Sequence, residues 1–400
     1  MERGQHLFMH SSKRQPVRNV FVMAVLAILL VPQIVYPCTH EYPDYDVMEN
    51  HSLRSFPDAS TAWDAIPAQI TNFYNDRLPY KTALRSFLAR VNYALFHDSL
   101  SSEVVIGNDG YLFYDNPEDG DPIKDAQGIA QYSNEQTQQM MFAIKENQTI
   151  ADSIGASLYY FTIPNKENVC FQYLPDYYTK VNHVTRFAKL QKQMQANDIA
   201  SYDCIKQLMT SDQQVYFKQD THWNKRGAYV GTLAYLKAVH PQLDEAWLRN
   251  VSFDDGQEDY QITDLIRLSM LTNTLKDVKP VETFHPEMDV NWYALYDSTV
   301  IESVNDDAPL NETLLVVGDS FRNSMMPFLS KAYRRCFFVR RDNYYSAYLS
   351  WLDPDEIMME GVERYAYDNF SFLLKDGGET YPLFQVESVD WGADVPETDQ

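Results

Sequence analysis

The chain begins with an apolar segment and continues with alternating strand-like and helix-like patterns. Residues 20–36 carry no charge, and a run of about 17 residues is at the short end of the range that crosses a bilayer. Four basic residues and Glu2 precede the run, so residues 1–19 carry a net charge of +3. Because basic flanks stay on the cytoplasmic side, we predict a cytoplasmic tail over 1–19 and a transmembrane signal anchor over 20–36.

A cleaved signal peptide is the alternative for this segment. Cleavage requires small residues before the cut, in an Ala-x-Ala-like pattern. The run instead ends in bulky residues between Gln33 and Tyr36, followed by Pro37 and Cys38. This favours a retained, single-pass anchor in the cell membrane, with the N-terminus inside. In either case we expect the rest of the chain to work outside the cytoplasm.

The pattern after the anchor predicts a stalk over 37–59 and one large domain over 60–375. Helical periodicity covers 60–97 with a break at 75–81, and two apolar runs around an Asn-Asp-Gly turn predict a hairpin over 104–114. Ser133 and Gln136 form a capping box that opens a helix. Further strands are predicted at 157–163, 313–317 and 335–339, and further helices at 185–197, 225–240 and 321–331.

Alternation of strands and helices predicts an α/β fold with a parallel sheet and helices on both faces. Residues 241–305 have weaker periodicity and are predicted to form an insertion. Residues 376–400 form an acidic tail.

The charge and the cysteine positions argue against two kinds of function, nucleic-acid binding and metal binding through cysteines. The chain of 400 residues has 33 basic and 56 acidic residues, a net charge of −23, which argues against a nucleic-acid partner. Its four cysteines are far apart and lack the paired short spacings of a metal site, so no metal is predicted. No cofactor is expected either. An oxidising compartment would permit a Cys170–Cys204 disulfide, and free buried thiols are the alternative.

The sharpest chemical signal is the turn Gly318-Asp319-Ser320. An apolar strand precedes it and a helix follows, so Ser320 is predicted at the carboxyl end of a strand and at a helix N-terminus, where ligands and negative charge are favoured. Glycine permits a sharp turn and close approach of a substrate. The alternative is that Asp319 or Ser320 only caps the helix.

A second signal is the segment from Asp220 to Asn224. A serine nucleophile needs an adjacent base, which histidine supplies near neutral pH, and a carboxylate that orients the imidazole. Asp220 and His222 lie two positions apart before the predicted 225–240 helix and meet that need together. A helix-capping aspartate beside a surface histidine is the alternative for this pair taken alone.

Together, Asp-Thr-His-Trp-Asn at 220–224 and Gly-Asp-Ser-Phe at 318–321 resemble the SGNH-hydrolase-like alginate O-acetyltransferases of the AlgX/AlgJ type and the related DHHW family. Supporting matches are the segments 74–81, 107–113, 164–166 and 362–365. The resemblance covers roughly residues 60–370. In ordinary SGNH esterases the serine block comes first, whereas here it follows the Asp–His block. The resemblance therefore implies a flavodoxin-like sheet with a circularly permuted motif order. Position 221 is Thr where DHHW proteins carry His.

The resemblance implies Ser320 as nucleophile, His222 as base and Asp220 as the orienting carboxylate. Candidate substrate-binding residues are Asn323, Arg322, Trp223, Asn165 and Lys166, and Glu363 with Arg364 is expected to form a structural ion pair. The implied activity is O-acetyl transfer to an exopolysaccharide or cell-wall glycan, with a multi-pass membrane O-acyltransferase supplying the acyl groups. A carbohydrate esterase with the same triad and a non-catalytic glycan-binding scaffold are the alternatives.

Overall fold

The computed structural model describes residues 14–42, 45–46, 51–244, 251–257, 263–272, 274–275, 277–284, 289–295, 300–375 and 386–388. Most of the predicted cytoplasmic tail, and the acidic tail apart from 386–388, lie outside the described residues. The chain divides into two units, Met1–Val91 and Asn92–Gln400. Helix α3 (Lys81–Phe96) begins in the first unit and ends in the second.

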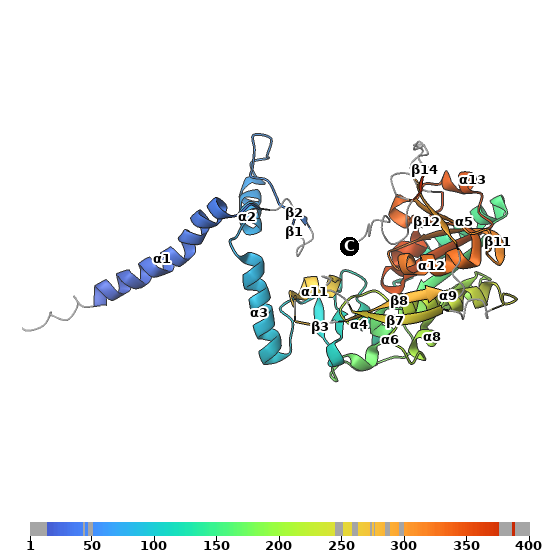
Figure 1. Ribbon diagram of the computed structural model, residues 1–400, viewed down its shortest axis with the longest axis horizontal. Coiled ribbons are helices and arrows are strands. Elements are labelled where there is room, and N and C mark those ends of the chain that lie inside the picture. The colour runs from blue at the N-terminus through green and yellow to red at the C-terminus, as the bar shows by residue number, and fades with distance from the viewer. Residues whose placement is uncertain are drawn as a thin grey trace, which may run out of the picture. The chain divides into compact units, whose positions relative to one another are not determined.

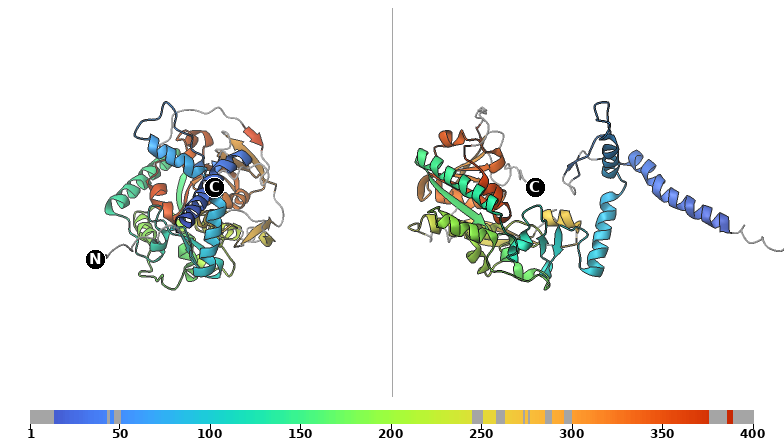
Figure 2. Two further views of the ribbon diagram at one scale, coloured as in Figure 1. Left: turned by 90° about the vertical axis from the view of Figure 1, so that its left-hand side faces the viewer. Right: turned by 180° about the vertical axis from the view of Figure 1, so that it is seen from behind.

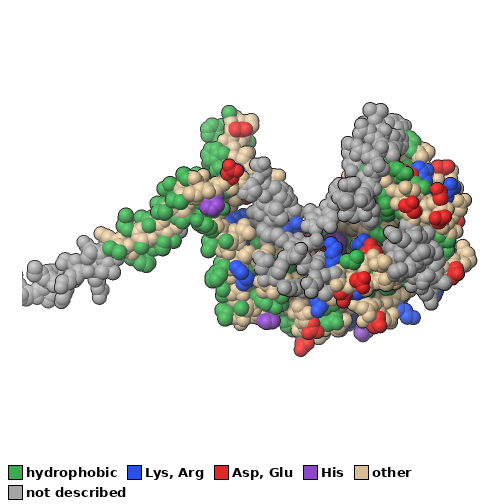
Figure 3. All heavy atoms as spheres, in the orientation of Figure 1, with side chains coloured by type: hydrophobic (Ala, Val, Ile, Leu, Met, Phe, Trp, Pro, Cys, Tyr) green, Lys and Arg blue, Asp and Glu red, His purple; other side chains and the backbone are tan. Residues whose placement is uncertain are grey.

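The first unit contains α1 (Arg14–Thr39), α2 (Ile66–Asp76), the start of α3 and a two-residue strand pair, β1 (Tyr45–Asp46) and β2 (His51–Ser52). One described helix is long and apolar enough to cross a membrane, over Arg18–Thr39 of α1, and its apolar side chains are exposed (Figure 3). Signal sequences have the same property, so the anchor and its orientation stay predictions. The break predicted in the 60–97 region lies between α2 and α3.

The second unit is built on an eight-stranded sheet in the order β14-β9-β10-β12-β11-β13-β5-β6 (Figure 1). Five neighbouring strands are parallel, which confirms a mostly parallel α/β sheet. They are β5 (Ser157–Ile163), β6 (Ser201–Asp203), β11 (Leu310–Gly318), β12 (Tyr333–Arg340) and β13 (Glu356–Val362). Three antiparallel strands extend one edge: β9 (Asn291–Leu295), β10 (Val300–Val304) and β14 (Val386–Ser388).

The order of the parallel strands shows the circular permutation directly. If strands are counted from β11, through β12 and β13 and then on to β5 and β6, the order across the sheet reads 2-1-3-4-5. This is the flavodoxin-like order, in which ligands bind at the switch point between strands 1 and 3. In this chain, that point lies between the carboxyl ends of β11 and β13.

Helices cover both faces of the sheet, as predicted. Side chains of a strand alternate between faces, and Leu314 and Val316 pack in one apolar cluster while Leu315 and Val317 pack in the other. Helices α9 (Lys225–Val239) and α12 (Arg322–Ala332) cover the first face, and α5 (Asn134–Ile154) and α7 (Arg186–Gln195) cover the second (Figures 1 and 2). The predicted capping box of Ser133 and Gln136 opens α5.

The predicted insertion over 241–305 is only partly separate from the sheet. Strands β7 (Val251–Gln257) and β8 (Val278–Phe284) pair with each other, and the short helix α11 (Asp264–Ser269) lies between them in sequence. However, β9 and β10 join the central sheet, so the end of this region is part of the core fold. Their five-residue length gave too little periodicity to separate them from loops.

The remaining described elements are short. The predicted hairpin is formed by β3 (Val104–Ile106) and β4 (Leu112–Tyr114). Short helices are α4 (Pro122–Ala126), α6 (Lys166–Val169), α8 (Ile205–Met209), α13 (Tyr348–Leu352) and α14 (Ala366–Ser371), with 3-10 turns at Asn108–Gly110, Phe171–Tyr173, Arg341–Asn343 and Glu363–Tyr365. Cys170 and Cys204 are free and buried, so the structure has the free-thiol alternative rather than the disulfide.

Candidate active site

The turn after β11 is fixed by contacts to the neighbouring strand β13. A Cβ atom at position 318 would lie 2.0 Å from Glu360 Oε2, so only glycine fits there without displacing Glu360. The Asp319 carboxylate accepts the backbone N–H groups of Phe321 at 2.9 Å and Val362 at 2.8 Å. These contacts join the carboxyl ends of β11 and β13 and place Ser320 two residues before α12, at the switch point.

The loop that carries Asp220 and His222 is closed on itself. Tyr216 and Trp223 form an isolated antiparallel bridge, and the Phe217 N–H donates to the His222 carbonyl at 3.2 Å. Asn224 then caps α9 by accepting the Gly227 N–H at 3.1 Å. The tight loop therefore presents residues 220–222 at the start of α9, next to α12.

Three side chains of these two segments form a hydrogen-bonded chain. His222 Nδ1 lies 2.7 Å from Asp220 Oδ1, and His222 Nε2 lies 2.8 Å from Ser320 Oγ. The Asp220 oxygen also accepts the His222 backbone N–H at 2.8 Å. If Nδ1–H donates to Asp220, Nε2 accepts from the serine hydroxyl, which is the tautomer that a general base requires. The His222 side chain keeps 29% of its surface exposed, so a substrate can reach it.

The electrostatics of the pair are strongly coupled. Burial raises the pKa of the Asp220 carboxyl, but the charge of His222 and its hydrogen bonds outweigh burial and hold that pKa at about 2. Burial lowers the pKa of His222, but the charge of Asp220, its hydrogen bond to the ring and the charge of Asp264 together outweigh burial, so the net pKa lies above its ordinary value. Asp220 is therefore ionised at neutral pH and stabilises the imidazolium that would form when His222 takes a proton.

A second carboxylate beside His222, that of Asp264, was missed from the sequence. Its Oδ2 lies 3.9 Å from His222 Nδ1, its Oδ1 accepts the Thr221 N–H at 3.0 Å, and its carboxylate also accepts the Thr221 hydroxyl. Burial and the charge of Asp220 raise the pKa of Asp264. The residue lies in the weakly periodic region before β9, where no local pattern marks it as functional.

Asp220, His222 and Asp264 each offer one atom to a group that could hold a metal ion, with these atoms within 4.8 Å of one another. The same atoms are already engaged, because Asp220 bonds His222 Nδ1 and both Asp264 oxygens accept from Thr221. A cation would have to replace these hydrogen bonds. The contacts favour an orienting network for the histidine.

Trp223, Arg322 and Asn323 surround the site in different ways. Trp223 is fully buried, and its indole N–H donates to the Phe321 carbonyl at 3.1 Å, which ties the histidine loop to the serine turn. Arg322 is also buried and donates to the Asp319 carbonyl at 2.8 Å. Asn323 is half-buried in the first turn of α12, and its backbone N–H donates to the Ser320 carbonyl at 3.1 Å. Their roles toward substrate stay predictions.

Asn165 and Lys166 are buried beneath the site at the end of β5. The Asn165 backbone N–H donates to Glu363 at 2.8 Å, and its side-chain oxygen accepts the Arg364 N–H at 3.0 Å. The Lys166 ammonium donates to the Asp220 carbonyl at 2.9 Å. Both residues therefore hold the backbone that carries the site.

Glu363 and Arg364 bond to other groups in the described part of the chain, in place of the expected pair. Glu363 accepts from Asn168 as well as Asn165, and burial raises its pKa to about 8. The Arg364 guanidinium lies 3.4 Å from the Thr221 hydroxyl and 5.5 Å from the centre of the Phe321 ring. Arg364 thus brings a positive charge from the end of β13 to the switch point.

A permuted flavodoxin-like sheet, with a serine and a histidine in contact at its switch point, defines the SGNH-hydrolase-like class. A family model described as "SGNH hydrolase-like domain, acetyltransferase AlgX" matches residues 104–336, more than half of the chain. The chain belongs to this family and is an O-acyltransferase. Comparison with curated proteins gives no match.

Several solved structures have a similar fold. Bacillus cereus PatB1 is 15% identical with a TM-score of 0.52, and the alignment covers 67% of this chain and 99% of that chain. PatB1 with a sulfonyl adduct is 14% identical with a TM-score of 0.51, and the alignment covers 68% of this chain and 99% of that chain. A DHHW family protein from Eubacterium siraeum is 13% identical with a TM-score of 0.50, and the alignment again covers 68% of this chain and 99% of that chain. At these identities the likeness shows the fold alone.

Proposed function

We propose that this protein is a membrane-anchored, extracytoplasmic O-acetyltransferase that acetylates hydroxyl groups of a polysaccharide through Ser320, His222 and Asp220. The observation that carries the proposal is the unbroken chain of hydrogen bonds from Ser320 Oγ through His222 to Asp220. Family membership supplies the class of reaction. The apolar stretch in α1 supports a tether in the membrane.

In the first half-reaction, Ser320 Oγ attacks the carbonyl carbon of a donor ester and its proton passes to His222 Nε2. The leaving alcohol takes that proton as its bond to the acyl group breaks. Acetyl-Ser320 remains on the enzyme, and Asp220 stabilises the imidazolium during the transfer. The Ser320 backbone N–H, which makes no hydrogen bond within the described segments, supports an oxyanion site next to the helix N-terminus.

In the second half-reaction, an acceptor hydroxyl takes the place of the leaving alcohol. His222 Nε2 removes its proton, the acceptor oxygen attacks the acetyl carbon, and Ser320 Oγ leaves with that proton. Water in the same position would give ester hydrolysis. The difference between transferase and esterase therefore depends on which hydroxyl reaches the acyl-enzyme. The resemblance to AlgX/AlgJ proteins favours a glycan acceptor and a multi-pass membrane O-acyltransferase as the source of acyl groups.

Replacement of Ser320 with alanine tests this proposal. We expect S320A to lose acetyl transfer to an oligosaccharide while it stays folded, because the hydroxyl is part-exposed. The matched control is Ser324→Ala, in the first turn of α12, whose side chain is also half-buried. Transfer that survives in S320A would overturn the proposal. Release of free acetate without oligosaccharide acetylation by the wild type would assign the esterase activity instead.

A further inference from the structure

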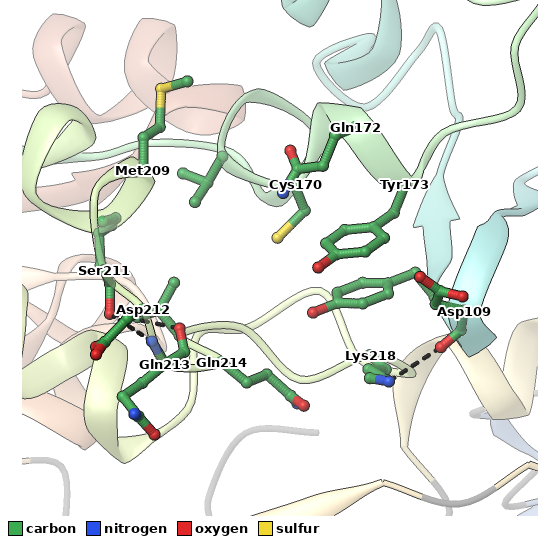
Figure 4. Close-up of a pocket in the computed structure, with 14 residues that line it drawn as sticks. Asp109, Cys170, Gln172, Tyr173, Met209, Ser211, Asp212, Gln213, Gln214 and Lys218 are labelled. Atoms are coloured by element: carbon green, nitrogen blue, oxygen red, sulfur yellow. Dashed lines mark hydrogen bonds between the residues drawn. The ribbon is translucent and has the colours of Figure 1, made fainter.

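A polar cavity lies on the loop that leads into the catalytic residues. Its volume is about 510 Å3, within the roughly 300–1,000 Å3 typical of small-molecule sites. The walls come from the turn at Asp109, the 3-10 segment Phe171–Tyr173 and the chain from Leu208 to Lys218 (Figure 4). Figure 4 shows Gln172 and Tyr173 on one wall and the residues from Asp212 to Gln214 across from them.

Most polar side chains on these walls have no partner among the residues that the structure describes. Within the described residues, no hydrogen bond or ion pair engages the side chains of Gln172, Asp212 and Gln213, or the carboxylate of Asp109. The Gln214 side-chain nitrogen donates to the Tyr216 carbonyl and to Asp277, while no described residue bonds its side-chain oxygen. The cavity therefore offers both donors and acceptors to a ligand rich in hydroxyl groups.

Two tyrosines form one side of the cavity. The rings of Tyr111 and Tyr173 stack with centroids 4.2 Å apart and planes 7° from parallel, so their faces cover each other. Their hydroxyl groups make no hydrogen bond in the described part of the chain. The Lys218 ammonium lies 5.3 Å from the centre of the Tyr111 ring and donates to the Asp109 carbonyl at 3.0 Å. The stacked tyrosines thus present two hydroxyl groups that no described residue bonds.

The cavity and the reacting groups share one loop. Val215 and Lys218 line the cavity, and Asp220 follows Lys218 by two residues. The Lys218 carbonyl and the Asp220 carbonyl accept from the same ammonium group, that of Lys166. A ligand bound against Lys218 is therefore held by the same rigid backbone that holds His222.

We propose that this cavity is a glycan subsite that binds an uncharged part of the acceptor chain outside the reacting sugar. This inference rests on the proposed transferase function, because only a transferase has a glycan acceptor. Binding of the glycan itself does not depend on acyl transfer. The charge of the walls selects a neutral glycan. Asp109 and Asp212 contribute two carboxylates against the single ammonium of Lys218, so the walls carry a net negative charge that repels the carboxylates of a polyuronate.

Binding is measured by titration calorimetry with the full chain in detergent micelles, in the S320A background so that no acyl transfer occurs. The probes are two neutral tetrasaccharides, cellotetraose and chitotetraose, and one polyuronate, tetramannuronate. We expect a neutral tetrasaccharide to bind and the polyuronate to bind at least tenfold more weakly. The double variant Gln172→Ala, Gln213→Ala should weaken neutral binding about tenfold, as expected for loss of two hydrogen-bonding groups.

The matched control is Gln193→Ala, an exposed glutamine on α7 that is not part of the cavity. It should bind as the parent does, and thermal unfolding should be the same for all variants because the three glutamines are exposed. Equal affinity in the double variant, stronger binding of the polyuronate, or no binding of either neutral probe would overturn the subsite. Because S320A binds without reacting, none of these outcomes depends on whether the triad is catalytic.

Discussion

The Lys166 ammonium is buried behind the catalytic loop, and its replacement by methionine should both destabilise the protein and impair the site. The group donates to three main-chain carbonyls, those of Leu112 at 2.6 Å, Lys218 at 2.8 Å and Asp220 at 2.9 Å, which uses all three of its N–H bonds. Only 1% of the residue is exposed. Methionine keeps the length and apolar stem of the side chain but removes every donor.

The magnitude follows from opposing terms. Hydrogen bonds to a charged group contribute roughly 1.5–3 kcal/mol each, so three of them give an upper bound of about 9 kcal/mol. Burial of an ammonium costs several kcal/mol, and burial lowers the pKa of Lys166 accordingly. K166M leaves three buried carbonyls unsatisfied at about 1–3 kcal/mol each and removes the burial cost of the ammonium, so we expect a net loss of about 3 kcal/mol of unfolding free energy. The Asp220 carbonyl would also lose its anchor, and we expect kcat to fall by a factor of about 10 to 100, since small displacements of reacting groups cost this much.

Urea unfolding followed by tryptophan fluorescence measures the first quantity, because Trp223 is fully buried on the same loop. The matched control is Lys192→Met on α7, where the side chain is exposed and should change the unfolding free energy by less than about 0.5 kcal/mol. A change below about 1 kcal/mol in K166M, together with normal acetyl transfer, would refute the view that Lys166 supports the loop from behind.

Three further changes probe the same site. His222 must be neutral to act as a base, and its pKa is raised. Acetyl transfer should therefore rise with pH through an apparent pKa above the ordinary value of about 6.5. A flat pH–rate profile from pH 5 to 8 would contradict this. Asp264→Asn removes a carboxylate that raises that pKa, so the acidic limb of the profile should move to lower pH, whereas a shift to higher pH would exclude this role. Gly318→Ala should cost about 1–3 kcal/mol of unfolding free energy, because its methyl group would clash with Glu360. Adding Glu360→Ala to this variant should restore part of the loss. Wild-type stability of G318A would disprove the clash.

The sequence predicted those elements whose structure depends on interactions within a few neighbouring residues. The capping box at Ser133, the apolar strand 157–163 and the Gly318-Asp319-Ser320 turn each carry their own explanation within a few residues, and each is found where it was expected. Strand β13 was missed although all seven of its residues are buried. It contains Glu356 and Glu360, and their partners, among them His240 and Asp319, come from distant segments, so its sequence does not read as a buried strand.

The same limit applies to the site: contacts between residues close in sequence were predictable, and contacts between distant segments were not. Asp220 and His222 are neighbours in sequence, and their relation follows from their spacing. Asp264 and Arg364 reach the same loop through Thr221, from 43 and 143 positions away, and no periodicity can reveal such contacts. Lys166 was predicted as a substrate-binding residue, yet its ammonium is directed into the protein, where it donates to three backbone carbonyl groups.

Topology explains why the two halves of the site appear in this order. In the 2-1-3-4-5 order counted from β11, β6 is the last strand, and the loop with Asp220 and His222 follows it. A chain that began at β11 would therefore place the serine first and the histidine last. Here the segment from α9 to β10 connects the last strand back to the first, and it brings Asp264 to the histidine on the way. The permutation thus leaves the switch-point geometry intact, while the connecting segment that it creates supplies a second carboxylate to the base.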